Sequence, residues 1–249
     1  MKIKLIILII IFLELSVHSQ ENFYQAKYTM TGKYLNNELY NATLIFNSTK
    51  SLYTYRVLSN KDKENVNDDK ISLTYSDKNT YYLYSDKIKD SIFDLTNRNK
   101  KYFYVTEAIP KLKWRLLKDE KIINKIKCLK ATTHFRGKNY IAWYTPSIVT
   151  PFGPWKLHGL PGLIMKAYDE SEIINFEIID LKTSSANFKL DLDDKLEKIN
   201  LISFVKEEKQ RIEKLIKVFK SRTEGHASSV ISRRDMEDNY YDLEKGLKF

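Results

Sequence analysis

The chain is poor in the residues that cross-link small exported domains. Its 249 residues include one cysteine, Cys128, so an intrachain disulfide framework is excluded. Cys128 stands in an alternating apolar stretch, which predicts a buried, unreactive thiol rather than a nucleophile. Stability must therefore come from packing of the 43% of residues that are hydrophobic.

Glycine and proline are also scarce, with seven and five residues. Four of the prolines and three of the glycines fall within residues 143–164, WYTPSIVTPFGPWKLHGLPGLI. Because proline fixes φ and glycine tolerates positive φ, this stretch is predicted to be a shaped loop that leads into a strand. Leu160-Pro161-Gly162-Leu163 has the sequence of a type II turn.

Long apolar runs are absent apart from residues 5–13, near the N-terminus. Two lysines precede this run, and small residues at Val17 and Ser19 follow it, a pattern typical of a secretory signal peptide. The run is too short to cross a bilayer, which takes roughly 20 apolar residues. We therefore expect a signal peptide over residues 1–19, cleavage near Ser19/Gln20, and a secreted or periplasmic protein without a transmembrane anchor.

Side chains that would carry catalysis or metal binding are sparse. The mature chain has three histidines (His134, His158 and His226), and none forms a close ligand pair. No nucleophile turn, phosphate loop or dinucleotide fingerprint is present. His158 could contact a ligand, but a lone histidine in a loop is more often simply hydrogen-bonded. The sequence thus predicts no catalytic residue, no metal and no cofactor.

Positive charge is concentrated in one segment. The formal net charge is +10, and residues 98–138 hold 13 Lys or Arg against three acids. This segment could face an anionic lipid, lipopolysaccharide or an acidic partner. The alternative is that the lysines are solvated strand faces that keep the protein soluble, which is the commoner use of such runs. No aromatic–basic motif indicates a nucleic-acid partner.

Between residues 23 and 182 apolar residues alternate in short runs. Examples are residues 24–30, 42–46 and 53–57, and later NYIAWYT, LIMKAYD and EIINFEIIDL. Arg136-Gly137-Lys138 and Asp77-Lys78-Asn79 read as hairpin turns, KLKWRLL as a strand, and residues 60–70 as a polar loop. The fold class is therefore mainly β, an antiparallel sheet or open, barrel-like half-barrel.

After residue 200 the spacing of apolar residues changes from the alternation of strands to the spacing of a helix. Ser203 is predicted to cap an amphipathic helix over about residues 203–222, packed on the sheet, although a membrane-surface helix is an alternative. Residues 223–249 read as a poorly ordered tail. The chain is thus expected to hold a signal peptide, one β-rich domain over residues 20–222 that includes the helix, and the tail.

Aromatic residues cluster in and beside the shaped loop. The set is Trp143, Tyr144, Phe152 and Trp155, to which His158 is adjacent. These residues could line a pocket for an apolar or planar ligand, or they could plug the mouth of the sheet. The loop is longer than a simple connection needs, which favours a functional or partner-binding role.

The stretch FRGKNYIAWYTPSIVTPFGPWKLHGLPGLIMKAYD resembles the GLPGLI family of exported proteins, whose motif stands here as Gly159-Leu160-Pro161-Gly162-Leu163-Ile164. The match covers residues 111–181 well, and departs from the family at Ile148-Val149-Thr150. The resemblance implies a Bacteroidetes-type, Gram-negative envelope setting and supplies no catalytic residue. The motif itself has no proton donor, nucleophile or metal ligand, a composition that suits architecture.

These observations favour an exported, non-enzymatic envelope protein that binds or scaffolds. Its ligand or partner would be an apolar small molecule, a lipid or an outer-membrane protein, with the loop 145–162 as the functional surface. The alternative is an envelope hydrolase that uses His158 with a nearby acid. That alternative requires the His158 ring to lie within hydrogen-bond reach of a carboxylate or hydroxyl.

Overall fold

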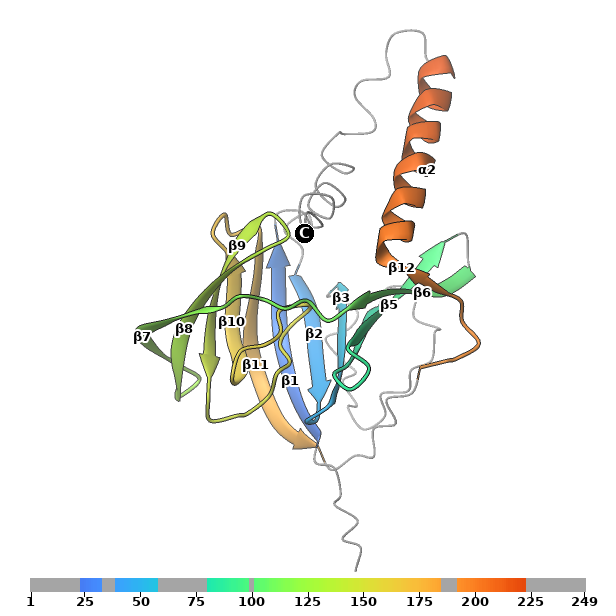
Figure 1. Ribbon diagram of the computed structural model, residues 1–249. Coiled ribbons are helices and arrows are strands. Elements are labelled where there is room, and N and C mark those ends of the chain that lie inside the picture. The colour runs from blue at the N-terminus through green and yellow to red at the C-terminus, as the bar shows by residue number, and fades with distance from the viewer. Residues whose placement is uncertain (1–22, 33–38, 58–79, 99–100, 185–191, 223–249) are drawn as a thin grey trace, which may run out of the picture.

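A computed structural model describes residues 23–32, 39–57, 80–98, 101–184 and 192–222 (Figure 1). The expected signal peptide, the loop at 60–70, the hairpin at 77–79 and the tail lie outside these residues. The first six strands are β1 (Phe23–Gly32), β2 (Leu39–Phe46), β3 (Lys50–Val57), β4 (Thr80–Asp86), β5 (Ser91–Arg98) and β6 (Lys101–Ala108). The others are β7 (Arg115–Ile123), β8 (Ile126–Phe135), β9 (Lys138–Thr145), β10 (Leu163–Asp169), β11 (Ile174–Ser184) and β12 (Lys198–Asn200), followed by helix α2 (Leu201–Arg222).

All twelve described strands form one open sheet, in the order β12-β6-β5-β4-β3-β2-β1-β11-β10-β9-β8-β7. Neighbouring strands are antiparallel except β12, which pairs with β6 in parallel. The predicted mainly β, open half-barrel with a C-terminal helix is therefore confirmed. The predicted strand KLKWRLL is wrong in its first half, because residues 109–114 form an irregular connection and the strand begins at Arg115.

Two hairpins close through two-residue turns. Arg136 and Gly137 both have positive φ (48° and 77°), as do Asn124 and Lys125 (49° and 64°). Positive φ at both central residues is the geometry of a type I′ turn, whose twist matches that of the flanking strands. The glycine at 137 adopts this conformation without strain, so the hairpin predicted there is confirmed.

One face of the sheet carries the main hydrophobic cluster, and two irregular connections pack against it. Figure 1 shows the first, residues 109–114, crossing in front of the sheet from β6 to β7. The second is the loop of residues 146–162 between β9 and β10. Core side chains under these connections include Tyr28, Leu44 and Phe176, each at most 1% exposed. The opposite face has a smaller cluster around Ile45, Leu52 and Tyr84, against which Leu192 and Leu196 pack.

Helix α2 begins directly after the edge strand β12. The Asn200 side chain accepts a hydrogen bond from the Ile202 amide (2.9 Å), so Asn200 and not Ser203 caps the helix. Leu201 and Val205 pack on Phe103 and Val105 of β6. The helix is about 33 Å long at 1.5 Å per residue, and its far end projects beyond the sheet (Figure 1). Within the described residues, no helix combines the length and apolar character needed to span a membrane.

Candidate functional site

The inner side of the loop at 146–162 belongs to the core. Phe152, Leu157 and Leu160 are 0–3% exposed and join the main cluster. Backbone hydrogen bonds hold the loop in shape: the Gly159 amide donates to the Pro151 carbonyl (2.8 Å) and the Leu163 amide to the Ile148 carbonyl (2.9 Å). The loop therefore fills the face of the sheet as a plug, which favours the structural one of the two interpretations of its aromatic residues.

The glycines of the loop serve close packing more than a type II turn. Such a turn needs positive φ at Gly162, but Gly159 is the residue in the left-handed region (φ 91°), so the predicted turn is wrong. A Cβ at Gly162 would collide with the backbone carbonyl of Thr145, and one at Gly153 with that of Leu157. Leu160, Leu163 and Ile164 enter the core, each at most 3% exposed, whereas Pro161 is exposed.

The aromatic residues predicted to bind ligand do not share one surface. Tyr144 and Phe152 are 3% and 2% exposed. Trp155 is half-buried against Phe135, with ring centroids 5.8 Å apart. Trp143 is half-buried, and because strand side chains alternate, it points to the face opposite that of Tyr144. The loop is open to solvent on its outer arc, where Val149 is 85% exposed, and near its end, where Gly159 and Pro161 are exposed.

His158 is buried without a polar partner for its ring. The side chain is 3% exposed and packs edge-on against Phe152, and neither ring nitrogen has a hydrogen-bond partner within the described part of the chain. Burial and the nearby Lys156 ammonium lower its pKa to about 4, so the ring is neutral at pH 7. Its backbone carbonyl accepts a hydrogen bond from Trp114 Nε1 (2.8 Å). The carboxylate or hydroxyl that the hydrolase hypothesis requires is not found there.

A buried ionic cluster ties the loop to the distant edge of the sheet. Lys156 Nζ lies 2.5 Å from Glu107 Oε1 and 3.7 Å from Asp94 Oδ2, and Arg136 Nη2 lies 2.5 Å from Glu107 Oε2. The Lys156, Arg136 and Glu107 side chains are 5%, 9% and 13% exposed. The Asp94 side chain is 37% exposed and is the cluster's opening to solvent. Partial desolvation, together with the nearby Glu107 carboxylate, raises its pKa. These two acids and two bases balance in charge.

Sequence reasoning missed this cluster because its members are far apart in the chain. Glu107 and Lys156 are 49 residues apart, and Glu107 and Arg136 are 29 apart. Each residue type is common here, and no short spacing connects them. The one local signal is Lys156 itself, a lysine placed between Trp155 and Leu157 in an otherwise apolar loop.

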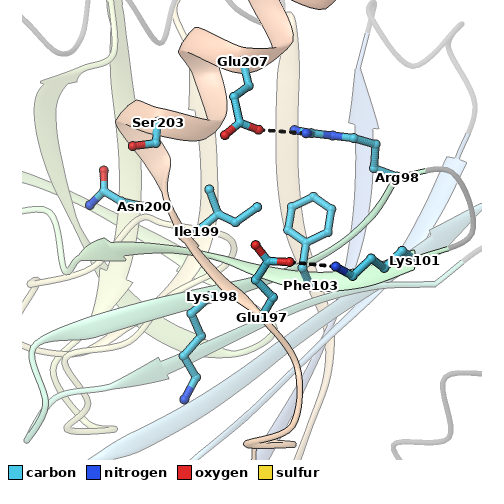
Figure 2. Close-up of a pocket in the computed structure, with 9 residues that line it drawn as sticks. All are labelled: Arg98, Lys101, Phe103, Glu197, Lys198, Ile199, Asn200, Ser203 and Glu207. Atoms are coloured by element: carbon cyan, nitrogen blue, oxygen red, sulfur yellow. Dashed lines mark hydrogen bonds and ion pairs between the residues drawn. The ribbon is translucent and has the colours of Figure 1, made fainter.

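An open hollow of about 670 Å³ lies where α2 meets β6 and β12 (Figure 2). Its lining comprises Arg98, Lys101, Phe103, Glu197, Lys198, Ile199, Asn200, Ser203 and Glu207. Figure 2 shows two ion pairs bordering the space, Arg98–Glu207 above and Lys101–Glu197 below, with Ile199 between them. Each pair has an N–O distance of 2.9 Å.

Arg98 fixes the helix at this hollow. Its guanidinium pairs with the buried Glu208 (2.8 Å) as well as with Glu207, and it lies over the rings of Phe103 and Phe204 at 5.3 and 5.2 Å from their centroids. A guanidinium combines ion pairing with stacking in this way, which lysine cannot reproduce. These contacts join the first turns of α2 to β5 and β6 beside the hollow.

Metal-binding geometry is not present in the described ranges: no group of three His, Cys, Asp or Glu side chains is placed to hold an ion. Cys128 is fully buried. The described residues therefore define an open, single-sheet β protein with a loop that plugs its inner face and a recess beside the C-terminal helix.

Comparison with known proteins finds similarity in fold. No family model matches the chain, and no curated protein matches it. Two crystal forms of PNGF-II are similar, each with a TM-score of 0.51 and 15% identity over 74% of this chain. The chain spans 32% of the length of PNGF-II, so the likeness concerns one part of a longer protein and shows the fold alone. A putative outer membrane lipoprotein-sorting protein domain from Vibrio parahaemolyticus has a TM-score of 0.31 and 9% identity over 72% of this chain and 89% of its own, from which we draw no conclusion.

Proposed function

We propose that this protein is an exported, non-enzymatic envelope module of the GLPGLI type that binds a segment of a protein partner in the hollow beside α2. The observation that carries the proposal is the open recess of about 670 Å³ between α2 and the sheet edge. The signal-like N-terminus and the GLPGLI motif support the envelope setting.

The lining of the hollow favours a protein partner over a lipid tail. Arg98, Lys101, Glu197 and Glu207 place both signs of charge around the space, whereas sites for apolar molecules are mostly lined by hydrophobic side chains. Charged rims of this kind set the orientation and specificity of protein partners. The loop packs its inner side into the core through Phe152, Leu157 and Leu160, so it can contribute at most its exposed residues to partner binding.

The test is to fill the hollow and measure what the protein retains. A Ser203→Trp variant places a large side chain in the recess, and Ile179→Trp is the control, because Ile179 is 54% exposed on β11. Both variants and the wild type are purified from the exporting cell and analysed by native mass spectrometry, followed by organic extraction. We expect a co-purifying protein that falls at least tenfold with Ser203→Trp and is unchanged with Ile179→Trp.

Two results would contradict the proposal. One is equal retention of the partner by both variants, which would place the binding surface elsewhere. The other is a small apolar molecule in the organic extract that survives the Ser203→Trp change, which would restore the carrier interpretation.

A further inference from the structure

The edge of the sheet at β7 is strongly basic. Among the described strands β7 pairs with β8 alone, and Figure 1 shows it at one end of the sheet. Residues 111–127 hold seven Lys or Arg and two acids, a net +5. All seven of these cations are exposed. We call this segment, residues 111–127, the basic edge.

Both acids of the basic edge take part in ion pairs. Glu120 pairs with Lys127 (2.7 Å) and Asp119 lies 3.7 Å from Lys130. All four side chains are at least 26% exposed, so these pairs are weak and screened by salt. The positive potential over the basic edge is therefore reduced by them only in part.

Large apolar side chains stand among these cations. Leu116 and Ile122 on β7 are 53% and 65% exposed. Lysines on an edge strand commonly protect it from pairing with another strand. Two exposed aliphatic side chains on the same strand work against such protection, so protection alone does not explain this composition.

A tryptophan lies beside the basic edge under two lysines. The ammonium groups of Lys121 and Lys130 are each 5.7 Å from the centroid of the half-buried Trp143 ring. Indole is amphipathic and is enriched where an apolar phase meets water. Lysine stems cover apolar surface while their charges remain in water, which suits the same boundary.

We propose that the basic edge docks this protein on an anionic phospholipid surface. Lysines act as point charges towards a sheet of lipid headgroups, while Leu116 and Ile122 reach the boundary with the acyl chains. An acidic protein could bind through the cations alone, and the exposed Leu116 and Ile122 would then have no role in binding. The inference goes beyond the hollow and is independent of it.

The experiment uses the mature chain, residues 20–249, and sedimentation with vesicles of phosphatidylcholine alone or mixed with phosphatidylglycerol. A lysine near an anionic surface contributes about 1 kcal/mol, or about fivefold in binding. Lys113→Gln with Lys118→Gln should therefore weaken binding to the mixed vesicles about 25-fold. Leu116→Ser with Ile122→Ser should lower it several-fold and remove the part that survives high salt.

The matched control is Lys87→Gln with Lys89→Gln. These two lysines flank the 76% exposed Ile88 in the β4–β5 turn, so the control has the same charge change and a similar local composition at another place. We expect it to bind as the wild type does. Equal binding to neutral vesicles, or an equal loss in the control, would overturn the proposal. Capture of soluble polyglutamate without capture of vesicles would also overturn it, in favour of an acidic protein.

Discussion

Lys156, in the loop between β9 and β10, pairs with Glu107 at the end of β6, across most of the sheet order. Their N–O distance is 2.5 Å, and both side chains are nearly buried. Because Glu107 also binds Arg136 of the β8–β9 turn, one carboxylate joins the plug, the hairpin and the distant half of the sheet. The open sheet is thus held in its curved shape by a buried ionic contact, without a disulfide.

Breaking that contact should cost stability. Glu107→Gln keeps the shape of the side chain but leaves Lys156 and Arg136 uncompensated, and loss of one member of a buried pair costs about 3–5 kcal/mol. We expect a fall of about 3 kcal/mol in the free energy of unfolding, measured by urea denaturation. The control Lys101→Gln removes the exposed Lys101–Glu197 pair and should cost less than about 1 kcal/mol. Equal urea midpoints for Glu107→Gln and Lys101→Gln would show that the buried contact of Glu107 adds no more stability than the exposed pair.

The two motif glycines should tolerate alanine differently. At Gly162 a Cβ would meet the Thr145 backbone carbonyl, which cannot move aside cheaply, so Gly162→Ala should cost about 3 kcal/mol. A Cβ at Gly159 would make only ordinary van der Waals contact with the Trp114 indole (4.0 Å), so positive φ is the main obstacle to a side chain, at a cost of about 1 kcal/mol. Thermal unfolding of both variants checks which one loses more stability. A larger loss of stability for Gly159→Ala would show that backbone strain, and not close packing, governs the motif.

The fold class could be predicted because it depends on local patterns. The alternation of apolar and polar residues predicted most strands, and Arg136-Gly137-Lys138 predicted a hairpin. β5 and β12 were not predicted, since SIFDLTNR mixes polar and apolar residues and β12 has three residues. The helix cap is Asn200 instead of Ser203, because β12 leads directly into the helix and the position of the first capping hydrogen bond is not visible in the sequence.

The site was harder to predict because it is made by contacts between distant segments. Trp114 and His158 are 44 residues apart, and their hydrogen bond joins the two connections that cover the sheet. The hollow exists because β12 pairs in parallel with β6, a strand far earlier in the chain, and brings α2 with it. No periodicity in the sequence encodes such a pairing, so the hollow could not be predicted and the aromatic loop was taken as the functional surface.

Cys128 should be inert in the folded protein. It is fully buried, and burial raises the pKa of its thiol, which lowers the thiolate fraction that reacts. We expect negligible labelling by a thiol reagent at neutral pH and complete labelling in concentrated guanidinium chloride. Rapid native labelling would contradict the burial of this strand and reopen a reactive role for the thiol.

Stability should fall as the pH is lowered, through His158. The folded pKa of about 4 lies below the ordinary value of 6.5, so the unfolded chain binds more protons between these values and acid favours unfolding. A shift of this size is worth about 3 kcal/mol, present above pH 6.5 and lost as the pH falls towards 4. The raised pKa of Asp94 acts in the opposite direction, because its protonated form is favoured on folding.

The contribution of His158 is isolated by comparing the wild type with His158→Phe, which keeps a ring against Phe152. We expect the variant to lose less stability than the wild type in urea titrations at successive pH values between 6.5 and 4. His134→Phe, at an exposed position, controls for the exchange of an imidazole for a phenyl ring. If all three proteins show the same pH dependence, His158 is protonated as readily in the folded state as in the unfolded chain, and its ring is open to water.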